Sequence, residues 1–319
     1  MVLEELTLRY YLKLSSLSAI LLIVFYLIYI VFFNQLFPKE KTIEIYKGDS
    51  IRAITEIIFE EKKYFDKKIS YFYLIVFNKF ISNVKYGKFY IKENTNLYSA
   101  INILSKKSNI DYNISIIEGW ESYKLDKYLS KFYNDIENIP YLNLIADTYK
   151  INSSNTFGDL KKFLVRKKDN FFRNYKNNEI LNIYGEKNIL IIASLVEKEA
   201  QNNEDKKLIT SVIFNRLNID MKLQIDATVI YSLTEGKSKL KRKLSLKDLK
   251  TNHKFNTYYI KALPPGMICY VSPKTIEIVL ENPKSDYLFY FYNIIEKKHI
   301  YSKNFKEHKA KLNDYRKKI

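Results

Sequence analysis

The stretch NILIIASLVEKEAQ, residues 188–201, places two glutamates two positions apart at the end of an apolar run. At about 100° per residue in a helix, Glu199 falls on the strongest apolar face, with Ile192 and Val196. Glu197 points to the opposite side, so the two carboxyls cannot form a pair with each other. The stretch therefore predicts a core helix whose last turn carries one carboxyl on its most apolar face.

A carboxyl on such a face has a specific chemical use. Loss of hydration raises its pKa and keeps it protonated near neutral pH, which is the state that a general acid requires. The alternative is that Glu199 sits at the helix end and reaches water or Lys198. Helical geometry alone leaves both interpretations open.

The next segment, DKKLITSVIFNRLNIDMKLQIDATVIY over 205–231, holds further polar candidates. Asn215 and Arg216 end a predicted helix. Gln224 and Asp226 follow in a predicted extended stretch, where period two puts them on the same side. Such side chains bind sugar hydroxyls or amides, although each alone is more often a helix-end or turn stabiliser.

Upstream, a short strand, a turn and an amphipathic helix recur three times, over residues 41–61, 87–107 and 113–132. The first copy has a helix cap in Ser50. This recurring strand–turn–helix pattern indicates an α+β fold for a small domain over residues 40–135.

The rest of the chain is less regular. Further predictions are a helix near 67–82, a helix near 159–175, a strand-like ATVIYSL at 227–233, a Lys-rich stretch at 237–250, a tight turn LPPGM at 263–267 in which Gly266 permits a positive φ, a dense strand DYLFYFYNI at 286–294 and a polar C-terminal helix.

Composition excludes more than it assigns. The net charge of +18 favours an acidic partner such as nucleic acid, anionic lipid or an anionic wall polymer. A general excess of Lys, Asn, Ile and Tyr explains the same charge, which is therefore weak evidence for any partner. A single cysteine, Cys269, excludes an internal disulfide and a cysteine-based zinc site. Three scattered histidines do not indicate a metal, and no cofactor is predicted.

Residues 14–37 contain no charged side chain. These 24 positions exceed the roughly 20 that a helix needs to cross a bilayer. The run ends without a small-residue cleavage site, so we predict one uncleaved transmembrane helix. Its orientation is not decided by the flanking cations, which are Arg9 and Lys13 before it and Lys39, Lys41 and Lys47 after it.

The motifs ASLVEKEA, FNRL, MKLQIDATVIY, FNTYYIKALPPGMI and HIYSKNFKEHK occur in the order and spacing of the MltG (YceG-like) endolytic murein transglycosylases, which the chain resembles. Upstream, GKFYI, IIEGW and LIADTYKI are similar to that family's LysM-like region and its connection to the catalytic domain. The resemblance implies a short cytoplasmic tail at 1–13, a transmembrane helix at 14–37, a LysM-like α+β domain at 40–135, a connecting segment at 136–187 and a YceG-like α+β catalytic domain at 188–319.

The resemblance also implies roles. Glu199 matches the catalytic acid and Glu197 is a support residue. The positions that would line the glycan groove are Asn215, Arg216, Gln224, Asp226, Asn256, Thr257 and Tyr258. His299, Glu307 and His308 match the family's C-terminal positions. A structural role for these residues is at least as well supported as a contact with the ligand. The chain departs from the family pattern at Ala200, Ala227, Phe255 and Met267, where threonine, proline, tyrosine and proline are usual.

By the same resemblance, the protein would sit in the inner (cytoplasmic) membrane, with its N-terminus cytoplasmic and its catalytic domain on the outer, periplasmic side. It would cut the MurNAc–GlcNAc bond of peptidoglycan glycan strands to 1,6-anhydro ends, beside peptidoglycan synthases (penicillin-binding proteins). Two alternatives stay open: a tethered wall-binding protein without catalysis, and a hydrolytic muramidase with Asp226 as second carboxyl. A nucleic-acid partner is not predicted, because an aromatic-plus-basic recognition motif is missing.

Overall fold

The computed structural model describes residues 2–46, 48–59 and 64–318. The chain folds into two compact units. Unit 1 comprises Met1–Asn113 with Lys150–Asn155, and unit 2 comprises Ile114–Tyr149 with Thr156–Ile319. Both units contain helices and antiparallel strand pairs, so the predicted α+β class is confirmed.

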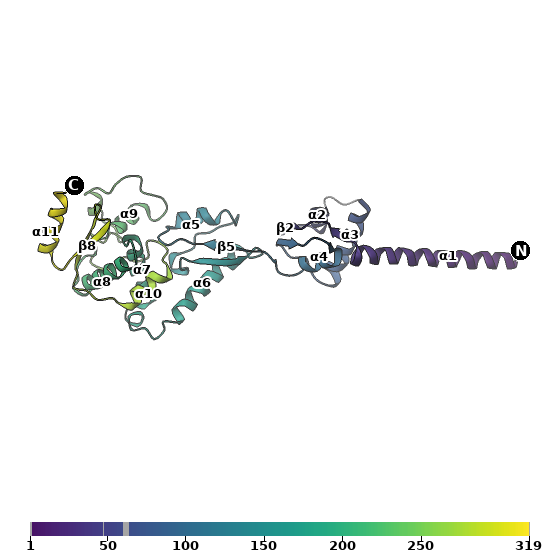
Figure 1. Ribbon diagram of the computed structural model, residues 1–319, viewed down its shortest axis with the longest axis horizontal. Coiled ribbons are helices and arrows are strands. Elements are labelled where there is room, and N and C mark those ends of the chain that lie inside the picture. Colours follow the sequence, from purple (N-terminus) through teal and green to yellow (C-terminus); the bar gives the residue numbers. More distant parts are fainter. Residues whose placement is uncertain (1, 47, 60–63, 319) are drawn as a thin grey trace. The chain divides into compact units, whose positions relative to one another are not determined.

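Unit 1 begins with α1 (Val2–Ile28), which continues into the π-helical turn η1 (Tyr29–Phe33) (Figure 1). Among the described residues, one helical stretch is long and apolar enough to span a membrane, over Lys13–Phe33. The predicted span runs to residue 37, but the helical segment ends at Phe33. Strand β1 (Gln35–Phe37) pairs there with β4 (Thr95–Asn96), and Leu36 and Phe37 are buried.

The remainder of unit 1 follows the predicted strand–turn–helix pattern. Strands β2 (Lys41–Ile45) and β3 (Gly87–Ile91) pair antiparallel, and their alternating apolar side chains are buried. The helices are α2 (Ile51–Ile58), α3 (Tyr64–Phe80) and α4 (Leu97–Leu104). The predicted cap is confirmed, because Ser50 Oγ accepts a hydrogen bond of 3.2 Å from the Ala53 backbone N–H.

The third strand–helix copy is divided between the units. Strand β5 (Asp111–Ser115) pairs with β6 (Thr148–Asn152), and the unit boundary falls within both strands. Helix α5 (Ser122–Leu129), which follows β5, belongs to unit 2. The predicted division at residue 135 and the division between the two units therefore differ, and the domain assignment stays a prediction.

Unit 2 is built around α7 (Glu179–Glu199), in which every side chain from 189 to 196 is buried. Gly185, at φ 73°, interrupts the helical backbone near its start. Helices α8 and α10 pack on α7 (Figure 1). The other elements are α6 (Phe157–Arg173), α8 (Asn203–Asn218), α9 (Asp226–Thr234), α10 (Pro273–Glu281), β7 (Phe289–Asn293), β8 (Lys298–Ser302), α11 (Phe305–Arg316) and the 3₁₀ turns η2 (Tyr141–Asn143) and η3 (Asp248–Lys250).

Two local predictions in unit 2 are wrong. The strand-like 227–233 forms α9, because Asp226 opens a helix whose Val229 is buried in the core. Gln224 has a left-handed φ of 51° and Asp226 is helical, so neither lies in an extended stretch. The chain bends at Gly266 as the LPPGM turn predicts, although Gly266 does not use the positive φ that glycine permits.

Candidate active site

Glu199 is the last residue of α7 and lines a cavity of about 380 Å³. The walls come from α8, the start of α9, the strand pair β7–β8 and α11. The lining residues are Glu199, Arg216, Gln224, Asp226, Tyr258, Phe289, Tyr290, Phe291, Tyr292, His299, Phe305 and His308. Four of the seven predicted groove residues, Arg216, Gln224, Asp226 and Tyr258, therefore share one cavity with the predicted acid.

The pKa of the Glu199 carboxyl is raised to about 7, chiefly by burial and also by the nearby Asp226 carboxylate. His299 and a hydrogen bond from the Ala227 backbone act in the opposite direction without cancelling the rise. The carbonyl end of α7 also disfavours a negative charge at its last residue. A substantial fraction of Glu199 is therefore protonated at neutral pH, as a general acid requires.

Asp226 occupies a different environment in the same cavity. It is the first residue of α9, where the helix dipole favours a negative charge. The Tyr258 hydroxyl donates a hydrogen bond of 2.7 Å to its Oδ1. Burial, reinforced by this carboxylate, raises the pKa of Tyr258, so the phenol remains a donor. Two carboxyls with contrasting surroundings thus meet in one cavity, which is a common arrangement for acid–base chemistry.

A second polar cluster, formed by Asp205, His299 and Tyr301, borders the cavity. The sequence did not predict that these three residues lie together. His299 Nδ1 lies 2.7 Å from Asp205 Oδ2, and the Tyr301 hydroxyl donates to Asp205 Oδ1. Burial opposes ionisation of Asp205, but these hydrogen bonds outweigh it and lower its pKa. Tyr290, which pairs with Tyr301 across β7–β8, is a further lining residue that the sequence did not reveal.

Arg216 is buried and uses its guanidinium mainly to hold backbone. Its Nε donates to the Leu288 carbonyl at 2.6 Å, and its Nη1 donates to the Leu223 carbonyl at 2.6 Å. The cation also lies 5.4 Å from the centroid of the Phe289 ring. Arg216 therefore joins α8 to β7 and to the approach to α9, and shapes one wall of the cavity.

Three predicted groove residues do not line the cavity. Asn215 Nδ2 donates to two carbonyls within 285–287, at 2.8 and 2.9 Å. Asn256, fully buried, donates to two carbonyls within 249–251, at 3.0 and 2.8 Å. Thr257, also fully buried, accepts a hydrogen bond of 2.9 Å from the backbone N–H that precedes α9. In this structure, these three side chains support the loops that carry the lining residues.

Glu197 supports the fold rather than the cavity. Its Oε1 accepts from Lys206 Nζ at 2.7 Å. Its Oε2 accepts from the Ser272 N–H and hydroxyl, at 3.1 and 2.9 Å, and from the Thr275 hydroxyl at 2.6 Å. The carboxylate therefore ties the end of α7 to α8 and to the N-terminus of α10.

Of the C-terminal candidates His308 and Glu307, one lines the cavity and the other does not. His308 lines the cavity and stacks on Phe289 with ring centroids 5.3 Å apart, and burial lowers its pKa. Glu307 accepts from the Lys303 backbone N–H at 2.8 Å in the first turn of α11 and does not line the cavity.

The sequence matches a known protein family. The model of the YceG-like family matches residues 43–314, which contain the complete cavity. The chain belongs to the YceG-like family. A crystal structure of a YceG-like protein from Listeria monocytogenes superposes on this YceG-like chain with a TM-score of 0.55 at 25% identity, over 86% of this chain and 99% of that one.

Curated relatives carry the name endolytic murein transglycosylase. The protein of Bacillus subtilis is 34% identical to this YceG-like chain over 170 residues, and that of Streptococcus pneumoniae is 32% identical over 170 residues. These matches cover 53% and 52% of this chain, but only 46% and 30% of the two relatives. The YceG-like chain thus aligns with less than half of each curated relative.

Proposed function

We propose that the protein is a membrane-anchored endolytic lytic transglycosylase that cuts the β-1,4 bond between MurNAc and GlcNAc within nascent glycan strands. The observation that carries the proposal is Glu199, a buried carboxyl of pKa about 7 in a cavity beside Asp226. The names of the curated relatives support the same activity.

The reaction needs only one ionisable group from the protein. Protonated Glu199 donates its proton to the glycosidic oxygen, and the bond from that oxygen to muramic C1 breaks. The C6 hydroxyl of the same muramic residue closes on C1, and its proton passes to the Glu199 carboxylate. The products are a 1,6-anhydro-MurNAc end and a new GlcNAc hydroxyl, and no water is consumed. A pKa near the working pH suits a group that serves as acid and then as base.

A hydrolytic muramidase is the second candidate, and Asp226 is the observation that favours it. Hydrolysis requires a second carboxyl, about 5–5.5 Å from the acid for retention or about 6.5–9.5 Å for inversion. Asp226 shares the cavity and keeps one hydrogen-bond donor, Tyr258, on its carboxylate. Hydrolysis would leave reducing ends, whereas transglycosylation leaves anhydro ends.

The proposal extends to the whole chain by family analogy. The Lys13–Phe33 helix would anchor the protein in the inner membrane with its N-terminus cytoplasmic. Part of the small α+β region would act as a LysM-like domain that binds glycan chains, and the catalytic domain would work outside the membrane beside peptidoglycan synthases. Cutting nascent strands there would limit their length.

The test is a digest of nascent glycan strands by the full-length protein in detergent micelles, with products identified by mass spectrometry. We expect internal cuts ending in 1,6-anhydro-MurNAc, abolished in Glu199→Gln. Glu204→Gln is the matched control, because this glutamate of α8 is 80% exposed at its side chain. Reducing ends would establish the muramidase instead. Binding of the strands without any cut would leave a wall-binding protein.

A further inference from the structure

A second cavity of about 380 Å³ lies beside the catalytic one in unit 2 and is here called the basic cavity. Helix α5, the end of α7, helix α9 and the Lys-rich stretch after α9 form its walls. It is lined by Glu121, Tyr123, Lys124, Lys198, Ala227, Ile230, Tyr231, Thr234, Ser238, Lys239, Leu240, Arg242 and Ile268.

Two residues place the basic cavity next to the catalytic carboxyl. Lys198 directly precedes Glu199 in α7. The backbone of Ala227 hydrogen-bonds to Glu199, while Ala227 itself lines the basic cavity. Consecutive residues therefore line the two cavities at two places in the chain, Lys198 with Glu199 and Asp226 with Ala227. The basic cavity is thus a neighbouring site for a substituent on a sugar held at Glu199.

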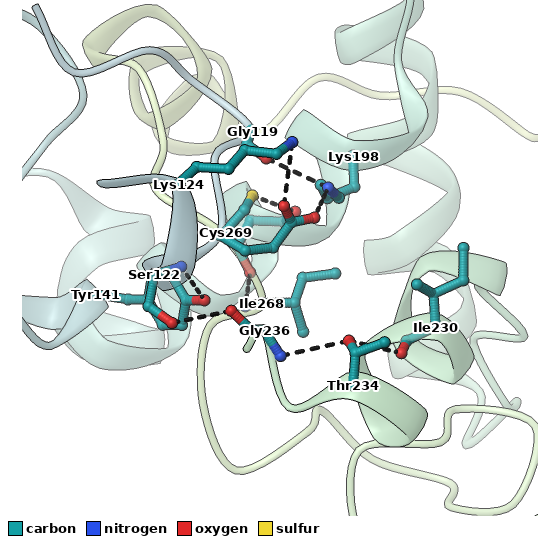
Figure 2. Close-up of polar contacts among 12 residues, drawn as sticks. Gly119, Ser122, Lys124, Tyr141, Lys198, Ile230, Thr234, Gly236, Ile268 and Cys269 are labelled. Atoms are coloured by element: carbon teal, nitrogen blue, oxygen red, sulfur yellow. Dashed lines mark hydrogen bonds and ion pairs between the residues drawn. The ribbon is translucent and has the colours of Figure 1, made fainter. Parts of the chain in front are cut away.

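Cations in the basic cavity outnumber the carboxylates that neutralise them. Lys124 and Lys198 share one partner, Glu121, and Figure 2 shows both ammonium groups directed at the same carboxylate. Lys239 has no ion pair with any carboxylate among the described residues. Arg242 is held by both oxygens of Asp248, at 2.5 and 2.9 Å. Three ammonium groups therefore line the cavity with a single carboxylate between them.

The Lys-rich wall is docked in a defined position. The Gly236 carbonyl accepts from the Ser122 hydroxyl at 3.0 Å, at the start of α5 (Figure 2). It also accepts from the Tyr123 N–H at 3.3 Å. A Cβ on Gly236 would approach Tyr141 Oη to 2.5 Å, so the close fit requires glycine. The cations that follow Gly236 are thus held over the cavity rather than left on a free loop.

We propose that the basic cavity binds the carboxylates of the peptide substituents that glycan strands carry on muramic acid, and so selects peptide-bearing strands for cutting. This inference rests on the proposed function. The three ammonium groups supply charge-assisted hydrogen bonds to carboxylates, and Ile230 and Ile268 supply an apolar wall for methyl-bearing residues. The occupant is a short anionic peptide attached to the sugar.

The test compares two substrates with two charge-matched variants of the full-length protein in micelles. The substrates are glycan strands with their peptides and the same strands after an amidase has removed them. Lys124→Ala/Lys239→Ala removes two cations from the cavity. Lys241→Ala/Lys243→Ala removes two exposed cations of the same stretch that do not line it.

We expect Lys124→Ala/Lys239→Ala to lower the kcat/KM ratio of peptide-bearing to peptide-free strands roughly tenfold, and the control pair to leave that ratio unchanged. An unchanged ratio in the cavity variant, or an equal fall in both, would overturn the inference. Binding of both strands to Glu199→Gln protein, with and without the two cavity substitutions, tests the same ratio of affinities when no strand is cut. If wild-type protein cuts neither strand, the proposed function fails, and this binding comparison still decides the role of the cavity.

Discussion

Glu197 and Glu199 lie within one turn of α7, and burial alone does not separate them. The Glu197 side chain is only 3% exposed, yet it faces Lys206 and three hydroxyl or amide donors. Glu199 instead lines the cavity beside the Asp226 carboxylate, and burial above all, together with that carboxylate, raises its pKa to about 7. The neighbours of the two carboxyls therefore give them different roles. A helical wheel cannot supply those neighbours, because they come from residues distant in the sequence.

The first prediction concerns the pH dependence of cutting. Activity requires protonated Glu199, so kcat/KM should fall as the pH rises through about 7. Asp226→Asn removes a negative charge that raises the Glu199 pKa, so in any residual activity the alkaline limb should move to lower pH. A pH–rate profile measures this shift. Tyr258→Phe is the control, since it retains the Asp226 charge, and a limb that moves upward in Asp226→Asn would contradict the assignment.

The second prediction concerns stability. The folded pKa of Glu199, about 7, lies above the ordinary value of 4.5. The stability linked to its proton is therefore fully present below about pH 4.5 and is lost as the pH rises through about 7. Glu199→Gln does not suffer this loss, so its free energy of unfolding should exceed that of wild type by about 1–3 kcal/mol at about pH 8, with a smaller difference at about pH 5. Urea unfolding at both pH values measures it, and a pH-independent difference would refute the buried acid.

The third prediction concerns Glu197. Glu197→Ala leaves Lys206 without its buried partner and removes the acceptor at the start of α10. Loss of one member of a buried pair costs about 3–5 kcal/mol. Urea unfolding should show this loss, whereas Glu204→Ala, at an exposed carboxylate of the same sequence region, should stay within about 0.5 kcal/mol of wild type. An equal loss of stability in Glu197→Ala and Glu204→Ala would contradict the support role of Glu197.

At the scale of elements, local pattern predicted most of unit 1 and failed at α9. Alternating apolar residues and the Ser50 cap are local signals, and both appear as predicted in β2 and α2. The 227–233 segment is rich in β-branched residues, which favours a strand locally, but Val229 packs in the core and the Thr228 and Thr257 hydroxyls bond to each other at 2.9 Å. Tertiary contacts therefore stabilise this segment as a helix, against its local preference for a strand. The Asp205–His299 pair was likewise missed because 94 residues separate its members.

The fourth prediction tests how the Lys-rich stretch is fixed on α5. Gly236 and Gly119 both have positive φ, 68° and 75°, but only Gly236 meets a close neighbour, Tyr141. Gly119→Ala therefore costs about 1 kcal/mol of backbone strain, and Gly236→Ala adds a steric clash to a similar strain. Limited proteolysis between 237 and 247 should accelerate in Gly236→Ala and not in Gly119→Ala. Equal rates would show that the stretch is not held through Gly236.

At the scale of the whole molecule, the apolar helix of unit 1 and the surface of unit 2 suit different environments. The side chains of Lys13–Phe33 that face outward are largely apolar and exposed, with Leu22 and Phe25 among them, so water does not suit them as a solvent. Unit 2 instead exposes many lysines and encloses a polar cavity. The flanking charges do not orient the helix, so the side on which unit 2 lies has to be measured.

The last prediction uses the single cysteine for that measurement. Cys269 is fully buried, and burial raises the pKa of its thiol, so it should not react with a maleimide in the folded protein. Two introduced cysteines then report topology: Lys13→Cys at the first residue of the Lys13–Phe33 span and Lys241→Cys in unit 2. A membrane-impermeant maleimide applied to spheroplasts should label Lys241→Cys at once and Lys13→Cys only after lysis, because a helix of this length leaves its two ends on opposite sides of the bilayer. Unmodified protein is the control for Cys269. The reverse pattern would place the cavity of Glu199 in the cytoplasm, away from any glycan strand, and labelling of both sites before lysis would mean that the helix does not span the membrane.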